Sequence, residues 1–287
     1  MLGAAACLLA PVSGRAEQRG DGDTDNIIAV DWAAAETLVM LGVCPIGIAD
    51  LDGFRRSFPG SLPDRPVADL GSNWEPNLEL IDRMHPARIY ISPWNALSQS
   101  SLSRIAPVHI NPIYAGDGRP LDKALSFARQ IDSDFPAIDI NLLQAVEIRL
   151  ESTRGLFAKT SRRQVLILNL HGSGRFANIY GGTSLAGNVL EHLGLENAWT
   201  APTNGFGFAR IGVDRLIEAT EASIVIIGQG EQTSRALQQL QDSAIWKAVP
   251  AVQAGRLHHS PPLSIFGGLA SAVSFAEWAA GSLARRV

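Results

Sequence analysis

The stretch IIAVDWAAAETLVMLGVCPIGIAD, residues 27–50, decides the fold prediction for this chain. The apolar run Ile27–Val30 predicts a strand, and Ala33–Leu41 predicts a short helix that ends at Gly42. A second strand is expected at Gly47–Asp50. This β-α-β opening lacks a glycine-rich phosphate loop between its first strand and its helix. The pattern therefore argues against a nucleotide enzyme and favours a sheet-based lobe that holds another kind of ligand.

Strand and helix patterns alternate in both halves of the chain, which predicts a mostly parallel sheet in each half. We therefore predict an α/β protein with an N-terminal lobe at 27–135 and a C-terminal lobe at 163–287, each with flanking helices. One long connecting helix is expected within 136–162, because Ile140–Lys159 is the longest helical candidate and carries a broad apolar face.

Composition and the N-terminus narrow the class of protein. The chain has 287 residues, 46% of them apolar, and a formal net charge of −4. It lacks a basic stretch of the kind that binds nucleic acid. Residues 1–16 predict a signal-like segment and 17–26 a flexible lead-in, so we expect a protein secreted by a cleavable signal. A disordered alanine-rich tail is the alternative for the first segment.

One pattern is similar to a serine hydrolase motif. Gly182–Ala186 lies between a predicted strand and a predicted helix, close to the G-x-S-x-G elbow, with Ser184 at the nucleophile position. Asp214 or Asp242 and then His258 follow in the order of a catalytic triad. The final glycine of the elbow is missing, however, and Ser184 also suits the N-cap of the helix that follows it. Helix capping is the favoured interpretation, and an esterase is the alternative.

Two further enzyme-like patterns are weaker. Gly172-Ser173-Gly174 follows a predicted strand, but the third glycine of the dinucleotide fingerprint is missing, so a turn is expected there. The six histidines lack metal-ligand spacing, and His258 and His259 are neighbours on a predicted strand, where their side chains point to opposite faces. We therefore expect no metal site built from protein ligands.

Aromatic residues recur in the predicted loops that follow strands or separate elements. In an α/β sheet such loops face the ligand crevice, where rings form a rigid apolar wall for an organic ligand. The alternative is that some of these rings pack between the lobes. The aromatic residues concerned are Trp74, Trp94, Tyr114, Phe206, Phe208 and Phe266.

Several segments, in this order and spacing, resemble one family along almost the whole chain after the N-terminal segment. With the opening stretch, they resemble class III periplasmic substrate-binding proteins of ABC importers, and most closely the ferric hydroxamate siderophore-binding family. The segments are Trp74–Leu80, Ser103–Pro107, Tyr180–Leu185, Asn197–Trp199, Val213–Leu216 and Ala254–Arg256.

The resemblance implies two α/β lobes, a rigid connecting helix and a shallow ligand cleft between the lobes. It implies capture of a ferric siderophore in the periplasm and delivery to an inner-membrane ABC permease, by a binding protein, expected to be a monomer, rather than an enzyme. No cofactor is expected, because Fe³⁺ arrives with its coordination shell filled by the siderophore. Haem and cobalamin are alternative ligands, since the same fold carries them.

The resemblance also assigns residues, with departures. Asn73 stands where the family has an arginine that contacts the hydroxamate oxygens, Asn95 beside Trp94 stands at a cleft tyrosine, and Phe206 replaces a tryptophan. The cationic fork of arginine is therefore lost at Asn73, and another arginine is needed to supply charge. A tris-catecholate complex, which needs several arginines, ranks below a hydroxamate. The expected ligand-binding residues are Asn73, Trp74, Trp94, Asn95, Arg104, Arg175, Phe206, Phe208, Arg210 and Phe266.

Carboxylates on each lobe are the family's docking points for permease arginines. Asp214 matches the C-terminal one, and Glu75 is a substitute on the N-terminal lobe. Exposed pairs of this kind orient partners more than they add affinity. The alternative is that both are ordinary carboxylates near helix starts, stabilised by the helix dipole.

Overall fold

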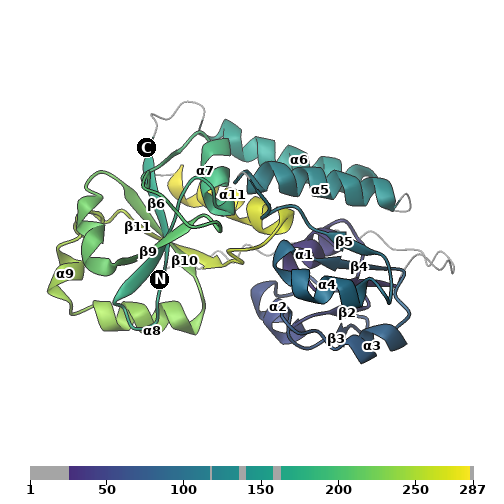
Figure 1. The fold of residues 1–287 in the computed structure, drawn as a ribbon. Coiled ribbons are helices and arrows are strands. Elements are labelled where there is room, and N and C mark those ends of the chain that lie inside the picture. Colours follow the sequence, from purple (N-terminus) through teal and green to yellow (C-terminus); the bar gives the residue numbers. More distant parts are fainter. Residues whose placement is uncertain (1–25, 117, 136–139, 158–162, 285–287) are drawn as a thin grey trace.

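The structure of the protein is a computed structural model that describes residues 26–116, 118–135, 140–157 and 163–284. Two sheet-based lobes lie side by side, and a layer of helices spans them (Figure 1). The α/β class and the two lobes are therefore confirmed. The predicted signal-like segment 1–16 and all but Asn26 of the lead-in lie outside the described residues, as do the two ends of the predicted connecting segment.

The sheet of the N-terminal lobe is parallel throughout, with the strand order β3-β2-β1-β4-β5. Helix α1 begins where expected, because the Asp31 carboxylate accepts a hydrogen bond from the backbone N–H of Ala34 at 2.8 Å and caps the first turn. The strands are β1 Ile27–Ala29, β2 Gly47–Ile48, β3 Ala68–Asp69, β4 Arg88–Ile91 and β5 Val108–Ile110. The helices are α1 Trp32–Met40, α2 Leu51–Ser57, α3 Leu78–Arg83, the 3₁₀ helix η1 Pro93–Asn95 and α4 Ala96–Leu102.

The sheet of the C-terminal lobe has the order β11-β10-β6-β7-β9, and the prediction of a mostly parallel second sheet is confirmed, because among these five strands β7 alone runs against the others. Strand β7 pairs antiparallel with both of its neighbours, β6 and β9. The sequences of β7 and β9 are FANIY and FARIG, and each strand mixes buried with partly exposed residues. The strands are β6 Gln164–Leu170, β7 Phe176–Tyr180, β8 Glu196–Asn197, β9 Phe208–Gly212, β10 Ser223–Gly228 and β11 Leu257–Pro262.

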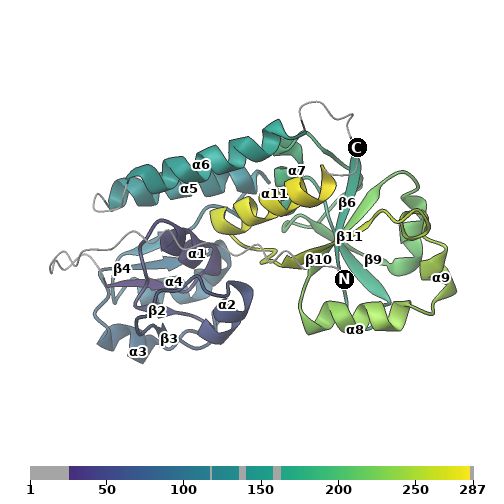
Figure 2. The same cartoon turned by 180° about the vertical axis from the view of Figure 1, so that it is seen from behind.

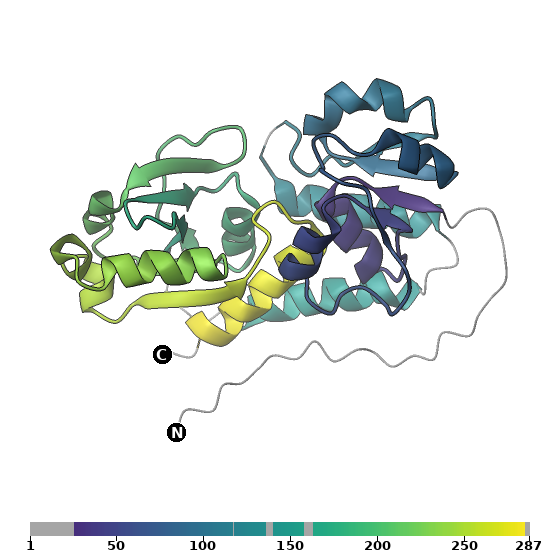
Figure 3. The ribbon, with the colours of Figure 1, turned by 90° about the horizontal axis from the view of Figure 1, so that it is seen from below.

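A layer of helices joins the lobes. Helices α5 and α6 run side by side, and α11 lies between the two lobes (Figures 2 and 3). The predicted connecting helix therefore exists as α6, 16 residues long, but it shares its position with α5 and α11. The remaining helices are α5 Pro120–Asp134, α6 Ile140–Gly155, α7 Leu185–His192, the 3₁₀ helix η2 Val213–Glu218, α8 Glu231–Leu240, α9 Ala244–Lys247, α10 Pro250–Gln253 and α11 Leu269–Leu283.

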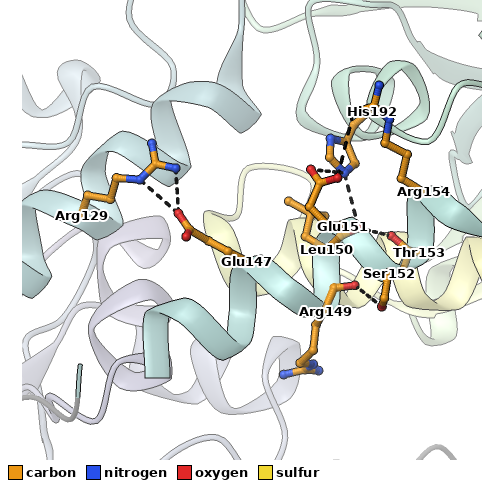
Figure 4. A network of polar contacts seen from close by, with 9 residues as sticks. All are labelled: Arg129, Glu147, Arg149, Leu150, Glu151, Ser152, Thr153, Arg154 and His192. Carbon is orange, nitrogen blue, oxygen red and sulfur yellow. Dashed lines mark hydrogen bonds and ion pairs between the residues drawn. The ribbon is translucent and has the colours of Figure 1, made fainter. Parts of the chain in front are cut away.

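Polar contacts fix this helical layer from outside. Arg129 of α5 pairs with Glu147 of α6 at 2.7 Å, and the His192 ring of α7 lies 3.4 Å from the Leu150 carbonyl oxygen of α6 (Figure 4). Beneath them, one apolar core contains residues of both sheets, for example Ile27 in β1 together with Val225 in β10. The two lobes therefore share part of one apolar core.

Within the described ranges, none of the helices combines the length and apolar composition that crossing a bilayer requires.

A candidate ligand site between the lobes

The N-terminal lobe presents its ligand-facing loops at the point where the strand order reverses. In the order β3-β2-β1-β4-β5, the connections that leave the carboxyl ends of β1 and β4 run toward opposite edges of the sheet, and ligands of α/β sheets bind at such a point, outside the carboxyl ends of the strands. Trp94 lies in η1, directly after β4, and Tyr114 lies in the loop after β5. Their ring centroids are 5.7 Å apart. The topology thus brings these two rings together at the expected crevice.

Rings of the C-terminal lobe meet them. Phe206 lies 5.8 Å and Phe266 6.2 Å from Trp94, measured between ring centroids. Phe266 also lies 5.8 Å from Tyr114 and 6.4 Å from Phe208. We call these five residues the interlobe ring cluster. Separations of this size are those of rings in direct contact, so the two lobes touch through aromatic side chains at this point.

Two of these residues differ in local structure from the sequence prediction. Phe208 is the first residue of β9 rather than part of a loop, and Trp94 belongs to a 3₁₀ helix. Pairing of Phe208 with Tyr180 across β7 and β9 places their side chains on the same sheet face, with ring centroids 6.2 Å apart. Tyr180, which is buried, therefore extends the cluster into the core. The sequence did not predict this contact, because it depends on the pairing of two short strands.

Asn95 is buried, and its side chain makes hydrogen bonds within the protein. It is 3% exposed, and its Oδ1 accepts hydrogen bonds from the backbone N–H of Ser92 at 2.9 Å and from the Ser92 hydroxyl at 2.5 Å. Its Nδ2 donates to the Asn73 carbonyl oxygen at 2.6 Å. The side chain thus fixes the turn that carries Trp94 and joins it to the segment that carries Asn73.

Trp74 stands apart from the interlobe ring cluster. Its side chain is 64% exposed, and no ring contact joins it to another aromatic residue within the described ranges. The bond between Asn95 and Asn73 nevertheless connects its segment to the Trp94 segment. Trp74 is therefore an exposed ring on the lobe that carries Trp94.

The three candidate arginines lie at different places. Arg210 lies on β9 two residues after Phe208, hence on the same sheet face, and its Nε donates to the Asn178 side chain at 3.1 Å. Arg175 precedes β7, at the end of this strand opposite to Tyr180 and roughly 17 Å from it along the strand. Arg104 follows α4, which leads back to the amino end of β5, so it lies at the sheet edge opposite to Trp94. The geometry brings Arg210 alone of the three alongside the ring cluster.

A buried carboxylate that the sequence analysis did not single out fixes the loop of Phe266. Glu36 in α1 is 2% exposed, and its carboxylate accepts hydrogen bonds from the backbone N–H of Gly268 and from the backbone N–H and hydroxyl of Ser271. Nearby, the Tyr114 hydroxyl donates to the Gly267 carbonyl oxygen at 2.5 Å. The signal was present, because Glu36 is the one charged residue of the apolar run Trp32–Met40.

The Ser184 hydroxyl serves as a helix cap. It accepts a hydrogen bond from the backbone N–H of Gly187 at 3.0 Å and donates to the Gly181 carbonyl oxygen at 2.7 Å, and Ser184 is 2% exposed. The N-cap interpretation is confirmed. The predicted turn at Gly172–Gly174 joins β6 to β7. Among the described residues, no three histidine, cysteine or acidic side chains come together in a group that could bind a metal ion.

The two candidate docking carboxylates are both exposed. Glu75 lies in the segment between β3 and α3, and Asp214 lies in the first turn of η2. They sit on different lobes, as a pair of docking points requires.

The fold and the ring-lined junction define a two-lobed ligand-binding protein of the α/β class. The chain is 31% identical over 262 residues, 88% of its length and 85% of the relative, to the iron(3+)-hydroxamate-binding protein FhuD of Escherichia coli strain K12. It is 24% identical over 237 residues to the Fe(3+) dicitrate-binding periplasmic protein FecB of the same organism, covering 79% of this chain and 74% of the relative. The sequence profile described as periplasmic binding protein matches residues 143–262.

A solved structure agrees in fold. The Fe³⁺–Desferal-bound siderophore-binding protein FhuD of Vibrio cholerae superimposes with a TM-score of 0.82 at 24% identity, covering 91% of this chain and 98% of that one. The chain therefore belongs to the periplasmic binding protein family, whose members here are substrate-binding proteins rather than enzymes. The resemblance to the ferric hydroxamate siderophore-binding family is confirmed.

Proposed function

We propose that this protein captures a ferric siderophore of the hydroxamate type and delivers it to an ABC permease. The observation that carries the proposal is the interlobe ring cluster, to which the N-terminal lobe contributes Trp94 and Tyr114 and the C-terminal lobe Phe206 and Phe266. Such a junction suits a bulky, largely apolar chelate that contacts both lobes at once. The relationship to the hydroxamate-binding protein of Escherichia coli supports this choice.

The charge around the cluster favours a neutral or weakly charged complex. Arg210 is the arginine that lies on the sheet face of Phe208, whereas Arg104 and Arg175 lie elsewhere. A highly anionic tris-catecholate complex needs several cations around it, because burying unpaired charge is costly. In this proposal Fe³⁺ is cargo that enters with its coordination shell already filled, and the protein needs no ligating side chains and no cofactor.

Binding requires the rings to part or the ligand to bind on their exposed side. A chelate cannot lie between Trp94 and Phe206 while their centroids are 5.8 Å apart. Phe206 is 44% exposed and Trp74 64%, so both offer a first contact surface. Displacement of Phe206 away from Trp94 then makes room for the ligand between the lobes, while Phe266 stays in place against Trp94 and Tyr114.

Tryptophan fluorescence tests the proposal. A ferric trihydroxamate should quench the emission of the protein with saturable binding, more tightly than a ferric tris-catecholate, haem or cobalamin. Trp94→Ala and Arg210→Ala should each weaken binding about tenfold, which corresponds to ~1.4 kcal/mol. Arg104→Ala is the matched control and should leave the affinity unchanged. Tight binding of haem or cobalamin with none of the ferric chelate would assign the site to those ligands instead.

Location and partners belong to the same proposal. As in its periplasmic relatives, the mature protein would act outside the inner membrane, with residues 1–16 removed as a signal, and would work as a monomer. Glu75 and Asp214 would pair with arginines of the permease. Exchanging both carboxylates for lysine should lower siderophore uptake by cells while leaving binding by the purified protein unchanged, and weakened binding would contradict this role.

A further inference from the structure

Glu36 connects the two lobes directly behind the interlobe ring cluster. It lies in α1 of the N-terminal lobe, and its hydrogen-bond partners in the described part of the chain are all on Gly268 and Ser271. Both of these residues follow Phe266, which belongs to the ring cluster. A side chain of one lobe therefore fixes the backbone that positions a ring of the other lobe.

The Glu36 carboxylate caps the N-terminus of α11, although it lies far from this helix in the sequence. Gly268 is the N-cap of α11 and has no side chain with which to cap it. Oε1 of Glu36 instead accepts from the backbone N–H of Gly268 and, at 3.0 Å, from that of Ser271, while Oε2 accepts from the Ser271 hydroxyl at 2.7 Å. These N–H groups are among those that the first turn of a helix leaves without partners. The bond pattern thus orients the start of α11 and the loop before it.

The chain approaches α1 too closely for larger residues at this point. A Cβ atom at Gly268 would lie 2.6 Å from the Ala33 carbonyl oxygen and 2.7 Å from the Thr37 hydroxyl, and one at Gly267 would lie 3.0 Å from Oε1 of Glu36. The Tyr114 hydroxyl holds the Gly267 carbonyl oxygen at 2.5 Å. Two residues of the N-terminal lobe thus hold this loop: Tyr114 bonds the carbonyl oxygen of Gly267, and Glu36 bonds the backbone N–H of Gly268.

We propose that Glu36 is a positioning residue for the ligand site, which holds Phe266 against Trp94 and Tyr114 by capping α11 from the opposite lobe. This inference rests on the proposed function for its binding consequence, although its structural part concerns the ligand-free protein. Removing the acceptor should release the Phe266 loop and separate the rings. Retaining the acceptor without the charge should leave the loop in place.

Ionisation of Glu36 disfavours the arrangement in which this carboxyl group is buried between α1 and the start of α11. Burial raises the pKa of Glu36 to about 7, the hydrogen bonds from Ser271 and Gly268 oppose this rise, and the nearby Asp31 carboxylate adds to it. Asp31 has a raised pKa for the same reason, burial, and Tyr114 is the other titratable group that faces Glu36. A state in which water reaches Glu36 has the lower pKa, so rising pH through about 7 favours loosening of the junction.

A ligand-free measurement tests the structural part. The emission of Trp94 is taken as the difference between each protein and the same protein carrying Trp94→Phe, from pH 5.5 to pH 8.5. In the unmodified protein the signal should change with a midpoint near 7. Glu36→Gln, which keeps the oxygen acceptor and is always neutral, should show the low-pH signal throughout. Glu36→Ala should show the high-pH signal of the unmodified protein at every pH. Glu79→Gln, which neutralises an exposed carboxylate on α3, is the matched control and should show the profile of the unmodified protein.

Binding of a ferric trihydroxamate by the same variants tests the consequence. Glu36→Ala should bind several-fold more weakly at pH 6, and Glu36→Gln should bind as tightly at pH 8 as at pH 6. Ser271→Ala removes one donor to the anion and should move the midpoint of the unmodified profile to higher pH, which keeps the test valid should Glu36→Ala fold poorly.

The outcomes separate the two proposals. An unchanged Trp94 signal in Glu36→Ala at pH 6, or the full pH profile persisting in Glu36→Gln, would overturn the role of Glu36. Expected emission changes combined with no binding of any ferric chelate would instead overturn the proposed function and leave the junction as described.

Discussion

Asn95 fixes Asn73 through its side-chain amide, whose Nδ2 donates to the Asn73 carbonyl oxygen at 2.6 Å. Both residues stand where the family resemblance implies ligand contacts, yet they act differently. Asn95 is buried and hydrogen-bonded through both its side-chain oxygen and its side-chain nitrogen, whereas the backbone of Asn73 accepts one of these bonds and its side chain is half-buried. In the proposed site, Asn95 therefore positions the turn that carries Trp94, and Asn73 is the member of the pair expected to contact the ligand.

Asn95→Ala should destabilise the protein by about 1–3 kcal/mol, because it leaves the buried Ser92 N–H and the Asn73 carbonyl oxygen without their partner. Urea denaturation measures the change. Asn73→Ala is the control: it retains the carbonyl group, so its stability should stay close to that of the unmodified protein while its siderophore affinity falls. Equal stability losses in both variants would contradict this division of roles.

Much of the fold could be predicted because the parallel N-terminal sheet and its helices follow one another in short, periodic segments. The opening stretch predicted β1, α1 and β2, and Ser184 was recognised as a cap from its place before a helix. The strands β7 and β9 received no residue ranges in the prediction, since five residues beside turns, without regular alternation, give no distinctive period.

The candidate site was predictable in its residue types but not in its contacts. Aromatic residues after strands indicated a ring-lined wall, and the cluster contains most of them. Glu36 and Gly268 lie far apart in the chain, so no local sequence pattern predicts that they contact each other. The sequence likewise could not separate Arg210 from Arg104, because that depends on which sheet edge or face each one occupies.

Ser184→Ala should cost about 1 kcal/mol of folding stability, the usual effect of losing an N-cap side chain. The same variant should bind ferric siderophore as tightly as the unmodified protein, since both partners of the hydroxyl are backbone groups of its own turn. Thermal denaturation and a binding titration check the two parts. An esterase activity that disappears in this variant would instead support the hydrolase alternative.

Gly268→Ala should destabilise the protein by about 1–3 kcal/mol, because its methyl group would collide with the Ala33 carbonyl oxygen and force α1 away from α11. Gly281→Ala in the same helix is the matched control. A Cβ there meets open space, so this variant should gain about 0.5–1 kcal/mol from the higher helix propensity of alanine. Chemical denaturation of both variants measures the difference, and a neutral Gly268→Ala would show that the two helices can separate freely.

The free energy of unfolding should fall as pH rises from about 5 to 8, and Glu36 should account for much of this fall. Its pKa is about 7 in the folded protein, against 4.5 for an ordinary glutamate, so the folded state binds more protons than the unfolded state between these values. Stability then decreases as pH rises through this window, by up to about 3 kcal/mol for such a shift. Denaturation of the unmodified protein and of Glu36→Gln at several pH values isolates the contribution, because the two proteins differ at this carboxyl group alone. The variant should gain stability relative to the unmodified protein as pH rises, and a constant difference between the two would show that Glu36 is already ionised at pH 5.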